Sequence, residues 1–239
     1  MTELTLTSAN LRWGLDAHDE PYDLEAALRG FDTDVVCLQE LWIGDDQPDR
    51  LDELARELGY DVLEQPMAPS FLRPRPEITA RPDEAHGTWG IALLTRRPIR
   101  RWRVVDLGRM VERWDVAHRR ALVAELDVDG VPIVVATVHL SFSPLNAAGQ
   151  LRRLRGALPP GRASIVVGDC NLWGPPAAAL LGGHRRAVRG RTWPARRPHS
   201  QLDHILVSPE IEVRAAAVGD PIGSDHLPVQ ARLGIATVG

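Results

Sequence analysis

The sequence SIVVGDCNLW, residues Ser164–Trp173, decides how this chain folds. It opens with a short apolar run rich in β-branched residues, and Asp169 and Asn171 follow directly. Such a run is typical of a buried strand, and polar side chains at its end lie at an edge of the sheet. The pattern therefore predicts a buried strand that delivers an acid and an amide to a functional edge.

Three other apolar runs carry a polar side chain in the same way. TLTSANLRW reaches Asn10, DVVCLQELW reaches Glu40 and IVVATVHLSF reaches His139. Open α/β sheets bind ligands beyond the carboxyl ends of their strands. We therefore expect the four runs to bring their polar groups together in one cluster.

Length and composition predict one soluble domain that spans residues 1–239. The chain is 44% hydrophobic, which is ordinary for a single α/β domain of this size. No basic stretch leads into an apolar one at the start, and no apolar segment approaches the roughly 18 residues of a membrane span. These features predict a cytoplasmic location. Cys37 and Cys170 both lie in strand-like runs, so we expect buried thiols and no disulfide.

The charge distribution bears on nucleic-acid binding. The net charge of −4 argues against non-specific coating of nucleic acid, which needs a basic surface. All 28 basic residues are arginine, and a dense group lies between His184 and Arg197. This region is either a solvated loop or a surface that binds phosphate groups of a substrate or nucleic acid. Its arginines are Arg185, Arg186, Arg189, Arg191, Arg196 and Arg197.

Hydrophobic periodicity predicts alternating strands and helices. Strands are expected at 4–9, 35–39, 88–95, 101–107, 120–128, 133–138, 165–167, 202–207 and 228–233, and helices at 22–30, 48–58, 146–158 and 175–181. Five prolines between Gln65 and Gly87 predict a long loop. Asp-Gly between Val128 and Val131 predicts a hairpin. The two halves share this rhythm, which favours two sheets face to face with helices outside.

The sequence GSDHLP, residues 223–228, places Asp225 next to His226. Adjacent side chains diverge in most backbone conformations, so we expect the two residues to serve different neighbours. A histidine that acts as a general base needs a carboxylate on its other ring nitrogen. Asp203, in LDHI, is the natural candidate. The alternative interpretation is a capped turn without catalytic function.

Glu40 lies among apolar neighbours, where a carboxylate needs a hydrogen bond or a cation. Mg²⁺ takes one or two carboxylates and keeps several waters, so Glu40 with Asp225 or Asn10 would form a sufficient site. An ordinary salt bridge is the alternative for Glu40. For His139 the alternative is a histidine at the edge of the core whose hydrogen bonds are made within the protein.

Asp169 and Asn171 are two residues apart, which puts them on one face of an extended strand. There they would hold a water molecule and the group it attacks. The alternative is an Asx turn that caps a helix near Pro175. Five tryptophans flank these motifs and are expected to wall the core rather than stack on substrate; they are Trp13, Trp42, Trp89, Trp173 and Trp193.

Taken in order, six motifs resemble the endonuclease/exonuclease/phosphatase family: SANLRW, CLQELW, TVHLS, GDCN, QLDHILVS and SDHLP. This family includes deoxyribonuclease I, abasic-site endonucleases, neutral sphingomyelinases and inositol polyphosphate 5-phosphatases. The resemblance covers essentially the whole chain. It implies an α/β fold, a four-layer α-β-β-α sandwich in which two mixed sheets lie face to face with helices outside.

The resemblance also implies Mg²⁺-dependent hydrolysis of phosphoesters by in-line attack of water, with Mn²⁺ as a possible substitute. Carried over by position, the metal ligands are Glu40, Asn10 and Asp225, and the catalytic residues are His226, Asp203, Asp169, Asn171 and His139. His226, oriented by Asp203, would be the base or a protonated contact to phosphate. Asp169 and Asn171 would place the water and the scissile phosphate. His139 would contact phosphate or assist the leaving group.

Two other functions stay open, a nuclease that binds DNA or RNA through the arginines of residues 185–197 and an inactive binding module with the same fold. The sequence also departs from the family pattern. Cys170 stands where the family's GDFN motif has an aromatic residue. The chain is short, and loops that mark abasic-site or 5-phosphatase members are not recognisable. The string TVHLS favours the sphingomyelinase and phosphatase members of the family over the abasic-site nucleases.

Overall fold

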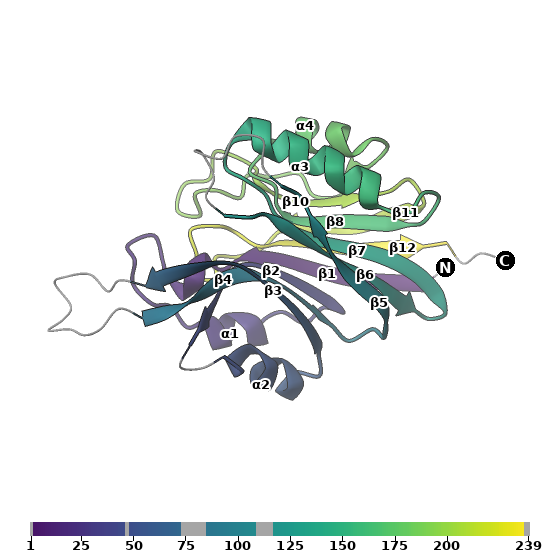
Figure 1. Ribbon diagram of the computed structural model, residues 1–239. Helices are drawn as coiled ribbons and strands as arrows, with labels where there is room; N and C mark the ends of the chain where they lie inside the picture. Colours follow the sequence, from purple (N-terminus) through teal and green to yellow (C-terminus); the bar gives the residue numbers. More distant parts are fainter. Residues whose placement is uncertain (1, 46–47, 73–84, 109–116, 237–239) are drawn as a thin grey trace, which may run out of the picture.

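Two six-stranded β-sheets packed face to face form the centre of the protein (Figure 1). The computed structural model describes residues 2–45, 48–72, 85–108 and 117–236. In spatial order, the first sheet contains β11 (Ile211–Val218), β12 (Val229–Ile235), β1 (Thr2–Asn10), β2 (Val35–Gly44), β4 (Ala85–Thr95) and β3 (Asp61–Leu72). The second contains β5 (Ile99–Asp106), β6 (Arg120–Val128), β7 (Val131–His139), β8 (Ser164–Asp169), β10 (Asp203–Val207) and β9 (Arg185–Arg186).

Both sheets are mixed. The pairs β1–β2 and β7–β8 are parallel, and every other described pair is antiparallel. Helices α1 (Leu24–Arg29) and α2 (Arg50–Glu57) cover the first sheet, while α3 (Pro144–Ala157) and α4 (Gly174–Leu181) cover the second (Figure 1). The predicted four-layer α-β-β-α sandwich is therefore confirmed. No helix in the described part of the chain is long and apolar enough to cross a bilayer.

Three apolar layers hold these four structural layers together. One lies between the sheets, where Leu6 and Val135 are buried. A second lies under α3 and α4 and receives Leu151 and Leu154, the helix face that the leucine spacing predicted. A third lies under α1 and α2. Both cysteines are buried and free, as expected.

The predicted loop between Gln65 and Gly87 is wrong at both ends. Strand β3 continues to Leu72, and β4 begins at Ala85; the remainder of the predicted loop, residues 73–84, lies outside the described residues. β3 is an edge strand, and an edge tolerates proline because its outer side has no ladder to break. Pro66 lies where the β3–β4 register shifts, a position where a proline does least harm to pairing.

Strand β11 was not predicted. It is the other edge of the first sheet, and most of its residues are exposed or half-buried. A strand of this kind lacks the apolar alternation that identifies a buried one.

The predicted hairpin between β6 and β7 is confirmed. Asp129 and Gly130 both have positive φ, +52° and +87°, as a two-residue type I′ turn requires.

Candidate active site

The carboxyl ends of the two parallel strand pairs meet and bring four polar side chains together. Asn10 ends β1, Glu40 lies in β2, His139 ends β7 and Asp169 ends β8. The Asn10 amide donates to Glu40 Oε1 at 3.2 Å and to Asp169 Oδ2 at 3.1 Å. His139 Nε2 lies 3.6 Å from the same Asp169 oxygen and 3.8 Å from Glu40 Oε1. Both sheets therefore contribute to one polar cluster.

A β-bulge aims Glu40 into this cluster. Gln39 pairs with Ile91 and Leu41 with Gly90, so Glu40 is the extra residue in β2. Its φ of +49° is unusual for a residue other than glycine and costs conformational energy. Residues strained in this way are often found at functional sites, where the surrounding structure holds them in place. Burial raises the pKa of the Glu40 carboxyl, although the bond from Asn10 opposes the change. Glu40 is thus a carboxylate whose ionised form a nearby cation would stabilise.

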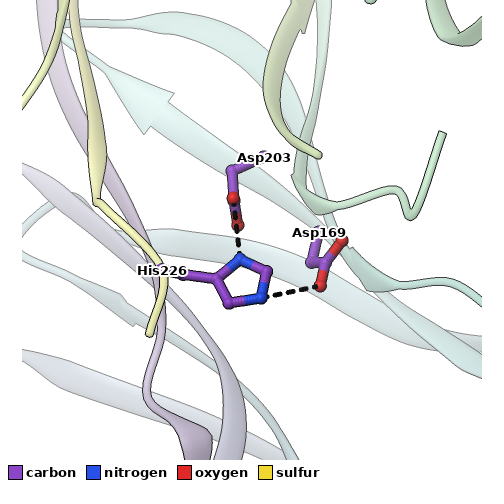
Figure 2. Close-up of side chains that lie close together, drawn as sticks. All are labelled: Asp169, Asp203 and His226. Carbon is purple, nitrogen blue, oxygen red and sulfur yellow. Dashed lines mark hydrogen bonds and ion pairs between the residues drawn. The ribbon is translucent and has the colours of Figure 1, made fainter. Parts of the chain in front are cut away.

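His226 lies between two buried carboxylates (Figure 2). Its Nδ1 is 2.9 Å from Asp203 Oδ2, and its Nε2 is 4.0 Å from Asp169 Oδ2. Asp203 begins β10 and stands directly opposite Asp169 of β8 in the antiparallel register. The backbone N–H of His226 also donates to Ser224 Oγ at 3.2 Å. The loop is therefore a capped turn, and the same turn presents His226 to the acidic pair.

The charges in this group shift the pKa values of its members. Burial opposes protonation of His226, but the charge and hydrogen bond of Asp203, with the charge of Asp169, raise its pKa to about 10. Burial and the nearby Asp203 raise the pKa of Asp169 to about 7. Burial and the Arg119 cation lower the pKa of His139 well below its usual value. Near neutral pH, His226 is thus an imidazolium, His139 is neutral and Asp169 can exchange a proton.

Asp169 and Asn171 do not lie on one extended face, so this prediction is wrong. The backbone N–H of Asn171 donates to Asp169 Oδ1 at 2.8 Å, and this Asx turn ends β8. Asn171 has a φ of +48°, and its amide donates to the Leu140 carbonyl at 2.9 Å. The turn does not cap α4, whose first turn receives no side-chain bond from Trp173. Asp169 Oδ2 still points to the polar cluster.

Asp225 and His226 serve different neighbours, as expected from their adjacency. The Trp193 indole N–H donates to Asp225 Oδ2 at 3.2 Å, and Arg12 Nε lies 3.6 Å from the same oxygen. Asp225 is thus engaged by an indole and a guanidinium at the rim of the site. Its assignment as a metal ligand stays a prediction.

A pocket of about 360 Å³ opens over the polar cluster. It is lined by Trp13, Glu40, Trp89, Arg119, His139, Phe142, Asp169, Asn171, Trp193, Leu202 and His226. Trp89 packs against the core between the sheets, as expected, and also lines the pocket. Trp13 and Trp193 line the pocket instead, and Trp173 is exposed, so the expectation is wrong for these three. Trp13 and Trp193 lie outside the strands of the core, in the turn after β1 and in the segment between β9 and β10.

Arg119 and Phe142 are pocket residues that the sequence analysis missed. Arg119 is buried just before β6, and its guanidinium lies 5.0 Å from the centre of the Trp89 ring. The sequence gives no signal for Arg119, because an Arg-Arg pair directly before a strand is ordinary. The fold shows that Arg119 is the arginine that enters the pocket. Phe142 follows the TVHLS motif by one residue, so proximity to His139 was the available signal.

None of the six arginines between residues 185 and 197 lines this pocket. Arg185 donates to the carbonyl of Ile211 at 2.5 Å, and Arg186 donates to Gln201 Oε1 at 3.1 Å. These two side chains therefore bind parts of the protein itself. Contact of the region with nucleic acid stays a prediction.

Residues 7–226 match the sequence model described as the Endonuclease/Exonuclease/phosphatase family. The chain belongs to this family. Family members are hydrolases that act on phosphoesters. No curated protein matches the sequence.

Solved structures of family members share the fold. An endonuclease/exonuclease/phosphatase from Beutenbergia cavernae has a TM-score of 0.77 at 22% identity, covering 99% of this chain and 72% of that one. A mannosyl-6-phosphatase from Bacteroides thetaiotaomicron has a TM-score of 0.72 at 17% identity, covering 97% and 100%. The human Nocturnin catalytic domain, solved with a bound sulfate anion, has a TM-score of 0.71 at 19% identity, covering 98% and 95%. At these identities the likeness concerns the fold.

Members of this family generally depend on a divalent metal, and the site has suitable donors. Donor atoms of Asp169, Asp203 and His226 all lie within 4.8 Å of one another. Glu40, whose carboxyl pKa is raised by burial, lies next to them through Asn10. Carboxylate oxygens are the ligands that Mg²⁺ prefers. Because His226 is protonated near neutral pH, the carboxylates of the cluster, Glu40 and Asp169 among them, are the donors that fit such an ion.

Gly168 lets β8 carry Asp169 into the site, which leads to a stability prediction. Its φ is +136°, and an added Cβ would lie 2.0 Å from the Val138 carbonyl oxygen in neighbouring β7. We expect Gly168→Ala to lower the free energy of unfolding by about 1–3 kcal/mol. Urea denaturation measures this change. Gly156→Ala is the control, because nothing lies within 4 Å of an added Cβ there and alanine favours helix α3. Equal stability of the two variants would contradict the argument.

Proposed function

We propose that this protein is a Mg²⁺-dependent phosphoester hydrolase in which a water molecule attacks phosphorus in line with the leaving oxygen. The observation that carries the proposal is the position of His226, bonded to Asp203 and facing Asp169, in a pocket that also contains Glu40. The phosphatase name of one structural neighbour supports the same class of reaction.

Glu40 would hold the metal ion, with Asn10 beside it at the metal or the phosphate. Mn²⁺ would serve in place of Mg²⁺, since both favour oxygen ligands. When bound, the ion would supply positive charge that offsets charge on the phosphoryl group and the leaving oxygen. Asp225, the other ligand suggested by the motif order, would first have to exchange its contacts with Arg12 and Trp193.

The electrostatics favour one of the two roles left open for His226. With a pKa of about 10, the imidazole is charged at neutral pH, so Nε2 would donate a hydrogen bond to a phosphoryl oxygen. Asp203 holds Nδ1 and thereby fixes the ring. Asp169, with a pKa of about 7, is the group better suited to accept the proton of the attacking water.

Three more residues complete the proposed site. Asn171, fixed by its bonds to Asp169 and Leu140, would help place the scissile phosphate. The low pKa of His139 keeps its ring neutral, so it would contact the phosphate or assist the leaving group without adding a charge. Arg119 would add a guanidinium on the pocket wall, and guanidinium groups match phosphate oxygens well.

Hydrolysis assays test the proposal. The panel contains an aryl phosphomonoester, an aryl phosphodiester, plasmid DNA and a sphingolipid, each with Mg²⁺ and with a chelator. We expect Mg²⁺-dependent cleavage of at least one phosphoester. Cleavage of plasmid DNA that falls steeply with salt would favour the nuclease. Cleavage of none would overturn the proposal in favour of a binding module.

The two shifted pKa values predict a bell-shaped dependence of kcat/KM on pH. Activity should rise as Asp169 loses its proton around pH 7 and fall as His226 loses its proton towards pH 10. Asp203→Asn removes the charge that raises the pKa of His226, so the alkaline limb should move to lower pH. Rates measured from pH 5 to 11 on one substrate check both points. An alkaline limb that stays in place in the variant would contradict this role for Asp203.

A further inference from the structure

Two of the four aromatic rings that line the pocket support catalytic groups. The Trp89 ring meets the His139 ring edge-on, with centroids 5.5 Å apart, and also lies beside the Arg119 guanidinium. The Trp193 centroid lies 6.5 Å from that of His226, and its indole N–H binds Asp225. Both tryptophans thus hold side chains of the polar cluster in place.

The other two rings, Trp13 and Phe142, have no such role. Among the described residues, neither ring contacts another ring or a cation. Trp13 lies in a short 3₁₀ turn, Arg12–Gly14, that follows β1 of the first sheet. Phe142 lies between β7 and α3, on the second sheet. They therefore enter the pocket from the loops of different sheets.

The loop that carries Trp13 is rigidly held. Arg12, Trp13 and Gly14 have successive φ values of +43°, +60° and +81°. Left-handed residues other than glycine are costly and persist only where the surroundings fix them. Here the Arg12 guanidinium binds Asp19 at 2.8 Å and the carbonyl of Asp16, and it lies near Asp225. The indole is thus preset in the pocket wall.

Phe142 is 63% exposed although it lines a pocket. Two more exposed apolar side chains follow in the chain, Leu145 at 59% in the first turn of α3 and Trp173 at 71% directly before α4. Scattered exposed apolar residues need no explanation, but Phe142 is an exposed ring in the wall of a polar pocket, where a ligand can cover it. Phe142 lines the same pocket as His139 and Asp169, which points to the part of a substrate that adjoins the phosphate.

We infer that Trp13 and Phe142 form a subsite for a planar aromatic ring on the alcohol side of the phosphoester, so that the substrates are aryl or nucleoside phosphoesters. The inference rests on the proposed function. A volume of about 360 Å³ lies at the lower end of small-molecule pockets and suits a phosphoryl group with an attached ring. Aromatic walls favour a planar ring because offset and edge-on contacts add to the burial of apolar surface.

Calorimetric titration with phosphonates tests the inference, because their carbon–phosphorus bond is not a phosphoester and binding needs no turnover. Phenylphosphonate and cyclohexylphosphonate have rings of similar size, and only the first is planar and aromatic. In the presence of Mg²⁺ we expect the phenyl compound to bind about five- to ten-fold more tightly. A nucleoside phosphonate in a third titration distinguishes a nucleobase from a simple aryl ring as the preferred group.

Phe142→Ala and Trp13→Ala should each remove most of this preference, while the affinity for cyclohexylphosphonate changes less. Phe142 is mostly exposed, so its variant should fold even if the Trp13 variant does not. Trp102→Ala is the control, since Trp102 is an exposed tryptophan of β5 outside this pocket. Equal binding of the two ligands by the wild type, or a preference that survives in Phe142→Ala, would overturn the inference. Hydrolysis without ring preference would leave the proposed function standing.

Discussion

Replacing His226 with alanine is expected to lower turnover by at least about 10²-fold, the scale of losing a charge-stabilising or proton-transferring group. The imidazolium lies between Asp203 and Asp169, so the variant loses the cation that would face the phosphate. The remaining carboxylates would then repel the substrate. Single-turnover rates on an aryl phosphoester with saturating Mg²⁺ measure the effect.

This experiment needs two controls. Loss of His226 leaves the buried Asp203 carboxylate without its partner, which also destabilises the protein. Thermal unfolding therefore shows whether the variant is folded at the assay temperature. His118→Ala removes the exposed histidine that pairs with Asp106 at 2.8 Å, outside the pocket, and should leave turnover unchanged. A folded His226→Ala protein with near-normal rates would remove the residue from the mechanism.

Glu40→Gln should cause a loss of similar size, at least about 10²-fold. Glutamine keeps the shape and can still accept the hydrogen bond from Asn10, so the change removes mainly the negative charge. We expect the loss to come with weaker activation by Mg²⁺, because the ion would lose its carboxylate ligand. The measurement is turnover as a function of Mg²⁺ concentration.

Glu64→Gln is a matched control for this substitution. Glu64 is also a half-buried carboxyl group in the first sheet, and burial raises its pKa to about 7. It lies in β3 and does not line the pocket. If Glu64→Gln and Glu40→Gln respond to Mg²⁺ alike, the effect comes from charge removal in general and the role of Glu40 fails.

The core of the fold could be predicted because its buried strands are short apolar runs with local signals at their ends. The run before Asp169 and the Asp-Gly turn at Asp129 are examples. The edge strands β3 and β11 could not be predicted in the same way. An edge strand has one paired side only, so prolines such as Pro66 and weakly patterned runs are tolerated there.

The site residues also differ in how well the sequence predicts them. Asn10, His139 and Asp169 stand at or beside strand ends, so sequence order indicated that they meet. Glu40 reaches the cluster through a β-bulge, and no signal in the sequence predicts that bulge. The contributions of Arg119 and Phe142 depend on how the two sheets face each other, which is a tertiary property. The single-domain extent and the cytoplasmic location stay predictions.

The most direct measurement is the position of the metal. Crystals grown with Mn²⁺ and measured near its absorption edge would show the ion by its anomalous scattering. We predict a peak within coordination distance of a Glu40 carboxylate oxygen, in the pocket that also contains His226 and Asp169. A peak elsewhere, or a fully ordered pocket with no ion at saturating Mn²⁺, would contradict the proposal that these side chains surround a catalytic cation.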